Sequence, residues 1–283
     1  MQQRKYVVGA GRVAVVTGAA SGIGLALSER FAAEGMSVVM ADVEAPALVR
    51  AADRLEARGA EVLPVTTDVS SGEQVDALRD RTLDAFGAVH VVCNNAGVTG
   101  LGRPLWEMSR RDWDWVLGVN LWGVINGIRA FVPALLEQDA GHVVNTASLA
   151  GLTTGVLGAY SVTKHAVVAL SEGLHFQLVQ RGAPVGVSAL CPGWVRTRIL
   201  DADRNRPAEL GPAPDPNPEL EAAREMVRQL VESGMDPADV AGHVVDAIRD
   251  GRFYVLTHPE MNEGIRRRAD EVLAGAPPGM AFL

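Results

Sequence analysis

Short apolar runs rich in β-branched residues alternate with longer segments of helical periodicity along most of this chain. Runs this short and this continuously apolar are typical of strands buried on both faces of a parallel sheet. They are Val13–Thr17, Ser37–Ala41, Glu61–Val65, Val89–Cys93, His142–Thr146, Val185–Leu190 and Phe253–Leu256. The helical segments include Gly22–Glu34, Ala45–Arg58, Gly72–Phe86, Ser109–Gln138 and Tyr160–Arg181. The alternation predicts the α/β class, with a doubly wound parallel sheet of about seven strands and helices on both faces.

The chain is long enough for one large domain, because it has 283 residues of which 48% are hydrophobic. We find no internal repeat and no interdomain linker, so we expect a single domain over residues 1–283 with its core at 10–200. A proline-rich stretch, 206–220, follows the sixth apolar run. Long insertions at this edge of a sheet commonly form lids. Residues 198–235 are therefore a predicted substrate-binding lid, with a plain surface excursion as the alternative, and 259–283 form a C-terminal tail.

A glycine-rich turn, "TGAASGIG", joins the first apolar run to the first helical segment. Its spacing, G-x-x-x-G-x-G, is a variant of the dinucleotide-binding fingerprint. Glycines let the backbone approach a diphosphate closely, and the helix that follows offers unpaired N–H groups and the positive end of its dipole. The position between strand and helix makes the signal strong. The predicted cofactor-binding residues here are Gly18, Ser21, Gly22, Ile23 and Gly24.

Asp42 directly follows the second apolar run, about 20 residues after the glycine turn, where dinucleotide-binding folds place an acidic residue. Its carboxylate can accept both hydroxyls of an adenosine ribose. The same place suits an N-cap for the helical segment that follows. We favour ribose binding over the cap.

Two further groups follow the third and fourth apolar runs, at the edge where this architecture binds ligands. Asp68 and Val69 form the first group, and Asn95, Ala96 and Gly97 form the second. The Asp68 carboxylate could bond an adenine amino group, and the 95–97 backbone could pass over the adenosine ribose. Asp, Asn and Gly also dominate ordinary turns, so turn chemistry is the alternative for both groups.

The stretch "AYSVTKH" contains two overlapping catalytic patterns. Ser161 and Lys164 form S-x-x-K, and Tyr160 and Lys164 form Y-x-x-x-K. Residues three or four apart share a face of a helix, so local geometry does not separate the two patterns. The partner motifs S-D-N and K-T-G, which accompany S-x-x-K in penicillin-interacting enzymes, do not occur in this chain.

Taken together, these residues resemble the short-chain dehydrogenase/reductase family. The matching motifs follow that family's order and spacing over about residues 10–200, and they are Thr17–Gly24, Asp68–Val69, Asn94–Gly97, Asn120, Ser148, Tyr160-x-x-x-Lys164 and Pro192–Thr197. The resemblance implies a Rossmann-type sheet, an NAD(P)-dependent oxidoreductase that interconverts an alcohol and a ketone, and a homotetramer or homodimer.

The resemblance also implies the roles of the catalytic residues. Tyr160 matches the family's catalytic acid/base, and the ammonium of Lys164 is expected to lower the tyrosine pKa from its usual value near 10. Lys164 would also bond the nicotinamide ribose. The Ser148 hydroxyl would bond the substrate oxygen, and Asn120 would hold a water beside the lysine, although an interior helical asparagine could equally be only tolerated.

The "PGWVRT" stretch matches the family's nicotinamide-binding segment. Thr197 would bond the nicotinamide carboxamide with the Val195 backbone beside it, and Pro192 and Gly193 would lie against the cofactor. Trp194, together with the leucines of 149–157, is a candidate wall of a pocket for an apolar or cyclic substrate. We expect the other four tryptophans, Trp106, Trp113, Trp115 and Trp122, to lie in the core.

The sequence favours NAD(H) over NADP(H). A 2′-phosphate would lie against the Asp42 carboxylate, and two like charges ~4 Å apart repel by about 1 to 4 kcal/mol. The residue after Asp42 is Val43 and the residue before Gly22 is Ser21, so neither neighbouring position carries the basic residue that NADP(H)-dependent members of the family often have.

Several other classes of function are disfavoured. A net charge of −8 argues against nucleic-acid binding, and no continuous apolar run reaches the ~18 residues of a membrane span. The six histidines lack metal-ligand spacing, so we expect no metal. Cys93 and Cys191 each end an apolar run and are expected to be buried reduced thiols, which suits a cytoplasmic protein. A dinucleotide-sensing regulator and a scaffold subunit are the non-catalytic alternatives, but the intact Tyr, Lys and glycine motifs count against both.

Overall fold

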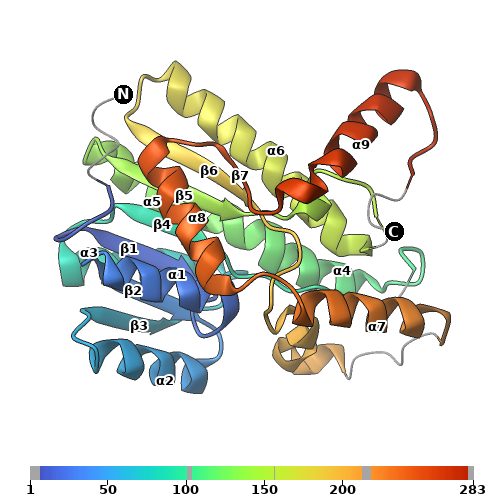
Figure 1. Ribbon diagram of the computed structural model, residues 1–283. Coiled ribbons are helices and arrows are strands. Elements are labelled where there is room, and N and C mark those ends of the chain that lie inside the picture. The colour runs from blue at the N-terminus through green and yellow to red at the C-terminus, as the bar shows by residue number, and fades with distance from the viewer. Residues whose placement is uncertain (1–6, 101–103, 156, 212–217, 280–283) are drawn as a thin grey trace.

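The computed structural model describes residues 7–100, 104–155, 157–211 and 218–279. Within them, seven parallel strands form one sheet in the order β3-β2-β1-β4-β5-β6-β7 (Figure 1). The strands are β1 (Val13–Thr17), β2 (Ser37–Asp42), β3 (Val62–Thr66), β4 (Val91–Asn94), β5 (Gly141–Thr146), β6 (Val185–Cys191) and β7 (Tyr254–Leu256). Each predicted run overlaps one of these strands, and the predicted fold class is confirmed. The strand order reverses between β1 and β4, which is where such sheets bind ligands.

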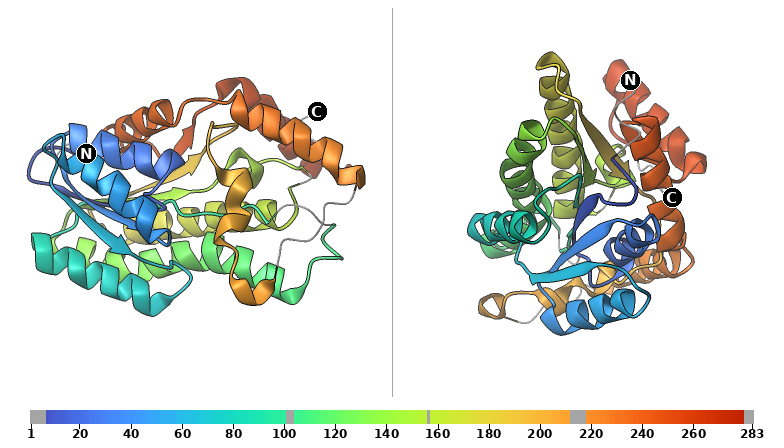
Figure 2. Two further views of the ribbon diagram at one scale, coloured as in Figure 1. Left: turned by 90° about the horizontal axis from the view of Figure 1, so that it is seen from below. Right: turned by 90° about the vertical axis from the view of Figure 1, so that its left-hand side faces the viewer.

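Helices cover both faces of the sheet, as Figure 2 shows where the sheet is seen nearly edge-on. One face carries α1 (Gly22–Ala33), α2 (Ala45–Glu56) and α8 (Pro237–Asp250). The other carries α3 (Gly72–Phe86), α5 (Gly123–Glu137) and α6 (Gly158–Gln180). In a right-handed crossover the direction in which the chain moves across the sheet sets the face that the helix covers, so α1 and α2 between β1 and β3 lie on one face and α3, α5 and α6 between β3 and β6 lie on the other.

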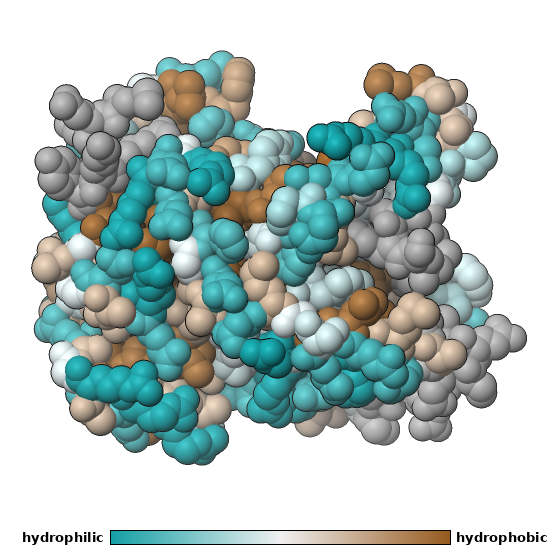
Figure 3. Space-filling view, in the orientation of Figure 1, coloured by the Kyte–Doolittle hydropathy of each residue, from teal (hydrophilic) through white to brown (hydrophobic). Residues whose placement is uncertain are grey.

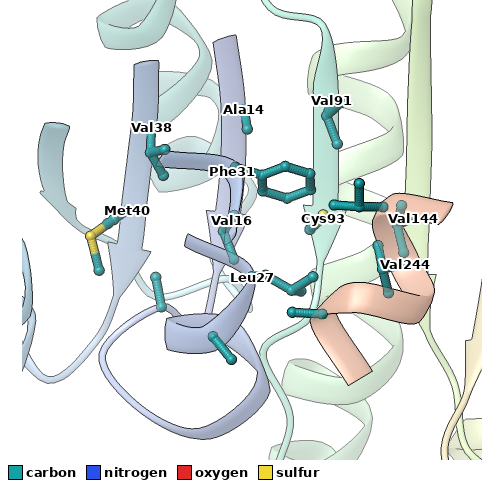
Figure 4. Close-up of a cluster of buried hydrophobic side chains, with 14 of the residues drawn as sticks. Ala14, Val16, Leu27, Phe31, Val38, Met40, Val91, Cys93, Val144 and Val244 are labelled. Atoms are coloured by element: carbon teal, nitrogen blue, oxygen red, sulfur yellow. The ribbon is translucent and has the colours of Figure 1, made fainter. Parts of the chain in front are cut away.

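The core lies between the sheet and these helices. Figure 4 shows Leu27 and Phe31 of α1 directed at the sheet, where Val16 of β1 and Cys93 of β4 meet them. All four side chains are fully buried. Because both faces of a parallel sheet are covered, its strands are largely continuous apolar runs rather than alternating ones.

The predicted single helix 109–138 is divided in the structure. It comprises α4 (Arg110–Leu117), a π-helical turn (Gly118–Trp122) and α5. The N-terminus of α4 is fixed by a capping box between Ser109 and Asp112. A π-helical turn widens the helix by one residue and is frequent at functional sites. Here it contains Asn120.

The segment predicted to be a lid begins with two short 3₁₀ turns, Ile199–Asn205 and Ala208–Leu210, and includes α7 (Pro218–Glu232). Ala202 of the first turn is buried against Val98 and Trp115. This packing places the segment beside the carboxyl edge of the sheet.

Helix α9 (Asn262–Ala274) projects from the body of the molecule, and Figure 3 shows hydrophobic atoms at its far end. Val272 and Leu273 are 68% and 85% exposed. No residue of α9, all of which the structure describes, is buried. Residues 280–283, the apolar end of the predicted tail, lie outside the described residues.

By length and a mean hydropathy of 1.4 alone, the stretch Arg110–Glu137 would be apolar enough to cross a membrane. It packs in this fold as α4, the π-helical turn and α5, and 50% of its most apolar window is buried. Asn120 and Asn126 interrupt its apolar residues, so the stretch holds no continuous apolar run of about 18 residues.

Candidate active site

A pocket of about 280 Å³ opens at the carboxyl edge of the sheet. Two residues predicted from the sequence, Gly24 and Asn120, do not line it but contact residues that do. The other predicted residues all line it, and they are Gly18, Ser21, Gly22, Ile23, Asp42, Asp68, Val69, Asn95, Ala96, Gly97, Ser148, Tyr160, Lys164, Pro192, Gly193, Val195 and Thr197.

The glycine turn needs its glycines for close backbone packing. Gly18 has φ +68°, and a side chain there would approach the Cα atom of Ala96 to 2.9 Å. A side chain on Gly24 would collide with the carbonyl oxygen of Gly18. The turn is also tied to the end of β4, because the Asn95 side-chain amide donates to the carbonyl of Thr17 at 2.9 Å.

The N-terminus of α1 faces the pocket through Gly22 and Ile23. Ser21 is the N-cap, and its side chain makes no capping hydrogen bond in the described structure. The first N–H groups of the helix are therefore not satisfied by a cap, and they lie at the positive end of the helix dipole. These residues fit the diphosphate of a dinucleotide.

Asp42 ends β2 and lines the pocket. One of its carboxylate oxygens accepts a hydrogen bond from the Ala20 amide at 2.9 Å, and the other accepts one from the Glu44 amide at 3.0 Å. The N-cap of α2 is Glu44, so the alternative placing Asp42 in that position is wrong. A carboxylate has about four acceptor sites, so two remain for hydroxyl groups.

Asp68 also has local bonds, since its Oδ1 accepts from the amide and the hydroxyl of Ser70 at 2.9 and 2.7 Å. This is the turn chemistry that the sequence left open, and it coexists with a place in the pocket lining.

Glu44 pairs with a cation in the pocket lining, and the sequence did not predict this cation. Its Oε1 lies 2.9 Å from Nε of Arg204 and accepts from the Asn205 side-chain amide at 3.0 Å. Burial would raise the pKa of Glu44, but the bond from Asn205 and the charge of Arg204 hold that pKa below its usual value. All three residues line the pocket. Arg204 follows Glu44 by 160 residues, so no local signal could connect them.

Tyr160 and Lys164 lie on one face of α6, with the Lys164 Nζ 5.4 Å from the centre of the Tyr160 ring. Lys164 is 3% exposed, and its ammonium donates to the Thr146 carbonyl at 2.8 Å. Burial lowers the pKa of Lys164 to about 8. Burial also raises the pKa of Tyr160, while a hydrogen bond with Ser148 opposes that shift. The net tyrosine shift is thus opposite to the one expected from the sequence, because desolvation outweighs the favourable contacts.

Ser148 follows β5 and is 8% exposed. Its hydroxyl donates to the Pro192 carbonyl at 3.4 Å and accepts from the Ala150 amide at 3.1 Å. Ser161, the nucleophile of the rival pattern, does not line the pocket, and its buried hydroxyl has no hydrogen-bond partner in the described structure. The fold therefore brings Tyr160, Lys164 and Ser148 together and leaves Ser161 out.

Asn120 is fully buried in the π-helical turn. Its Oδ1 accepts from the Val98 amide, and its Nδ2 donates to the Val98 carbonyl, both at 2.8 Å. Nδ2 also lies 3.1 Å from the Thr163 hydroxyl. The side chain thus fastens the loop after β4 to α6.

Charged and apolar residues occupy different parts of the pocket lining. Among the described lining residues, the charged ones besides Lys164 are Asp42, Glu44, Asp68, Arg198 and Arg204. The three acids lie at the ends of β2 and β3 or just after them, and the two arginines belong to the lid segment. Both arginines lie near Glu44. The remaining wall is mostly apolar and includes Trp115, Leu149, Leu157, Trp194, Leu200, Val227, Val231 and Met261.

The tryptophans do not all behave as expected. Trp194 lines the pocket, and so does Trp115, which is 8% exposed. Trp106 and Trp122 are 84% and 52% exposed, so the expectation of a core position was wrong for them. Side-chain size alone does not tell an interior aromatic residue from one at a pocket or an interface.

Comparison with known proteins decides the family. The model of the short chain dehydrogenase family matches residues 12–208. The chain belongs to that family. Among solved structures, a short-chain dehydrogenase/reductase from Burkholderia phymatum in complex with NAD is 47% identical, with a TM-score of 0.93 and coverage of 96% of this chain and 98% of that one.

Two curated short-chain dehydrogenase relatives are similar over much of their length. A 1-deoxy-11-beta-hydroxypentalenate dehydrogenase of Streptomyces exfoliatus is 42% identical over 264 residues, which cover 92% of this chain and 88% of the relative. A 3beta-hydroxysteroid dehydrogenase of Eggerthella lenta is 36% identical over 214 residues, which cover 75% and 81%. This short-chain dehydrogenase is therefore an NAD(P)-dependent oxidoreductase.

Proposed function

We propose that this enzyme interconverts a neutral, largely apolar secondary alcohol and its ketone, with NAD(H) preferred. One observation carries the proposal: Tyr160, buried Lys164 and Ser148 meet an apolar wall in the same pocket as the glycine-rich turn. When bound, the cofactor exchanges a hydride with the substrate carbon and, in its oxidised form, adds positive charge near the tyrosine.

Tyr160 holds the proton that moves to or from the substrate oxygen. Its pKa is raised by burial, so it is protonated at neutral pH and ready to donate in the reductive direction. In the oxidative direction it must first lose that proton. The Ser148 hydroxyl and the Lys164 ammonium favour the phenolate, and Ser148 also positions the substrate oxygen beside the phenol.

Lys164 and Asn120 complete the proton path in this proposal. Lys164 bonds the nicotinamide ribose as well as the Thr146 carbonyl. The side-chain amide of Asn120 is occupied by Val98 and Thr163, so the water beside Lys164 is held by the Asn120 backbone rather than by its side chain.

The preference for NAD(H) rests on charge at the adenosine end. Asp42 and Glu44 both line this part of the pocket. Two cations lie near Glu44, and each is already paired, Arg204 with Glu44 and Arg198 with Asp201. A 2′-phosphate would therefore meet the Asp42 carboxylate without a free guanidinium to offset it.

The substrate is neutral because the wall beyond Ser148 and Tyr160 is formed by Leu149, Leu157, Trp194 and other apolar residues. The two relatives described above are named as dehydrogenases of a 1-deoxy-11-beta-hydroxypentalenate and of a 3beta-hydroxysteroid. Both names describe substrates that carry a hydroxyl group. We expect a cyclic or otherwise bulky apolar alcohol.

The test is an absorbance assay of NADH with a panel of secondary alcohols and ketones that vary in size and charge. Bulky neutral substrates should give the highest kcat/KM, and carboxylate-bearing analogues of equal size should give at least about tenfold less. Turnover confined to charged substrates would refute the substrate class, and no turnover of any alcohol or ketone would refute the reaction.

We further propose a homodimer or homotetramer in the cytoplasm, without a nucleic-acid or membrane partner. The outward face of α6 carries exposed Phe176 and Val179, at 61% and 56%, and Trp122 next to α5 is 52% exposed. Apolar side chains of this size gather at interfaces between subunits.

A further inference from the structure

His258 lies directly behind the wall of the pocket. It follows β7 and is 7% exposed, and it does not line the pocket itself. Its two ring nitrogens contact the backbone of two consecutive residues in the segment after β6. Nδ1 is 3.1 Å from the Gly193 amide, and Nε2 is 3.0 Å from the Trp194 carbonyl.

These contacts determine the protonation of the ring. A backbone N–H can only donate and a backbone carbonyl can only accept. Nδ1 therefore accepts from Gly193, Nε2 carries the hydrogen that is donated to Trp194, and the imidazole is neutral. The Thr257 hydroxyl, 2.7 Å from Nδ1, lies beside the same nitrogen. Either added charge or removal of the ring would break at least one of the two backbone bonds.

The packing around Gly193 shows how tightly the ring holds this segment. A side chain on Gly193 would lie 2.8 Å from Cγ of His258 and 2.7 Å from the sulfur of Met261. Glycine at this position is therefore what allows the imidazole to reach both peptides. Met261, on the other side of the contact, lines the pocket.

The held segment leads directly to the reacting groups. Pro192, the residue before Gly193, accepts bonds through its carbonyl from the Ser148 hydroxyl at 3.4 Å and from the Leu149 amide at 2.9 Å. Trp194 forms part of the apolar wall. His258 thus connects β7, through the Pro192–Gly193 peptide, to the hydroxyl that contacts Tyr160.

We propose that His258 is a positioning residue for the nicotinamide end of the pocket: its neutral ring sets the path of Gly193 and Trp194, and thereby where the cofactor ring and the substrate rest against Ser148. The inference depends on the proposed function, because it assigns the nicotinamide to this end. It predicts that loss of His258 lowers the affinity for ligands that reach this end and leaves unchanged the affinity for ligands that occupy the adenosine end alone.

The experiment compares the affinities of NADH and ADP-ribose, which lacks the nicotinamide, for wild type and four variants. His258→Leu removes both bonds. His258→Asn retains an acceptor near Nδ1, and His258→Gln retains a donor near Nε2. His175→Leu is the matched control, because His175 lies on α6 outside the pocket and its ring packs at a tilt against Phe253, with the ring centres 5.1 Å apart. Thermal unfolding confirms that each variant is folded.

For His258→Leu we expect the Kd of NADH to rise at least about tenfold while the Kd of ADP-ribose stays within about twofold of wild type. The KM for the alcohol should rise and kcat should fall, and His258→Asn and His258→Gln should recover part of the loss. His175→Leu should match wild type.

Two results would overturn the proposal in different ways. His258 would be shown only to fill space if NADH affinity and kinetics were unchanged in folded His258→Asn, His258→Gln and His258→Leu proteins. Equal weakening of NADH and ADP-ribose binding would lead to the same conclusion. A wild type that binds neither ligand and oxidises no alcohol would instead refute the proposed function, and the role of His258 with it.

Discussion

The guanidinium of Arg204 lies 2.9 Å from the carboxylate of Glu44, and this ion pair joins the lid segment to the turn after β2. Both side chains are about a quarter exposed, at 24% and 23%. On the other side of the segment, Arg206 pairs with Asp112 of α4 and lies over the Trp115 ring. The turn Ile199–Asn205 is thus held from two sides of the pocket.

The Arg204–Glu44 pair should slow cofactor release, because both residues line the pocket at the end that we propose for the adenosine. Arg204→Gln and Glu44→Gln should each raise the dissociation rate of NADH several-fold in stopped-flow fluorescence, and kcat should rise wherever product release is limiting. The double variant should show little further change, since the pair is already broken. Arg79→Gln, which breaks ion pairs on α3, is the control. Unchanged dissociation in both single variants would contradict this.

Removing the tyrosine hydroxyl should separate binding from catalysis. Tyr160→Phe should bind NADH within a few-fold of wild type and lose about 10²- to 10⁴-fold in kcat, because only the transferable proton is removed. Ser161→Ala should stay within a few-fold in both quantities, since the Ser161 hydroxyl makes no hydrogen bond in the described structure. An inactive Ser161→Ala beside an active Tyr160→Phe would revive the S-x-x-K interpretation.

Cofactor choice should depend on Asp42. Wild type should show a much higher kcat/KM with NAD(H) than with NADP(H). Asp42→Ala should lower kcat/KM with NAD(H) and reduce the difference in kcat/KM between the two cofactors, because the ribose bonds and the repulsion of a 2′-phosphate are lost together. Asp42→Ala with Val43→Arg should favour NADP(H), since a guanidinium can pair with the phosphate. Steady-state kinetics with both cofactors measures this, and equal use of both by wild type would mean that Asp42 does not face the ribose.

Buried Lys164 should make the stability of the free protein depend on pH. Its pKa is about 8 in the folded state, below the value of about 10.4 for an unfolded lysine. Between these values the unfolded chain binds more protons than the folded one, so the free energy of unfolding rises with pH. Relative to Lys164→Met, the free energy of unfolding of wild type should rise by about 2 kcal/mol from pH 8 to 10. Denaturant titrations that run parallel for the two proteins would contradict this.

The exposed face of α6 should mediate assembly. Light scattering at micromolar concentration should show a dimer or tetramer, and Phe176→Glu should shift it towards monomer, because a charge would be placed in an apolar contact. Wild type that is monomeric at this concentration would contradict the proposed assembly.

Much of the fold could be predicted because its signals are local. Each strand is a short apolar run, and the period of the pattern changes from strand to helix within a few residues. The π-helical turn was missed for the same reason: hydrophobic periodicity over 109–138 continues through it, and only the packing of Asn120 against Val98 shows the extra residue.

The candidate site likewise has some residues that local sequence signals indicate and others that only tertiary contacts place there. By itself the sequence indicated the glycine turn, Asp42 and the Tyr160–Lys164 spacing, because each depends on backbone geometry or on neighbours within one helical turn. Only the tertiary structure brought Arg204 to Glu44 across 160 residues and His258 to Gly193 across 65. It also decided the direction of the Tyr160 pKa shift, because desolvation depends on everything packed around the phenol rather than on the one lysine that the sequence places beside it.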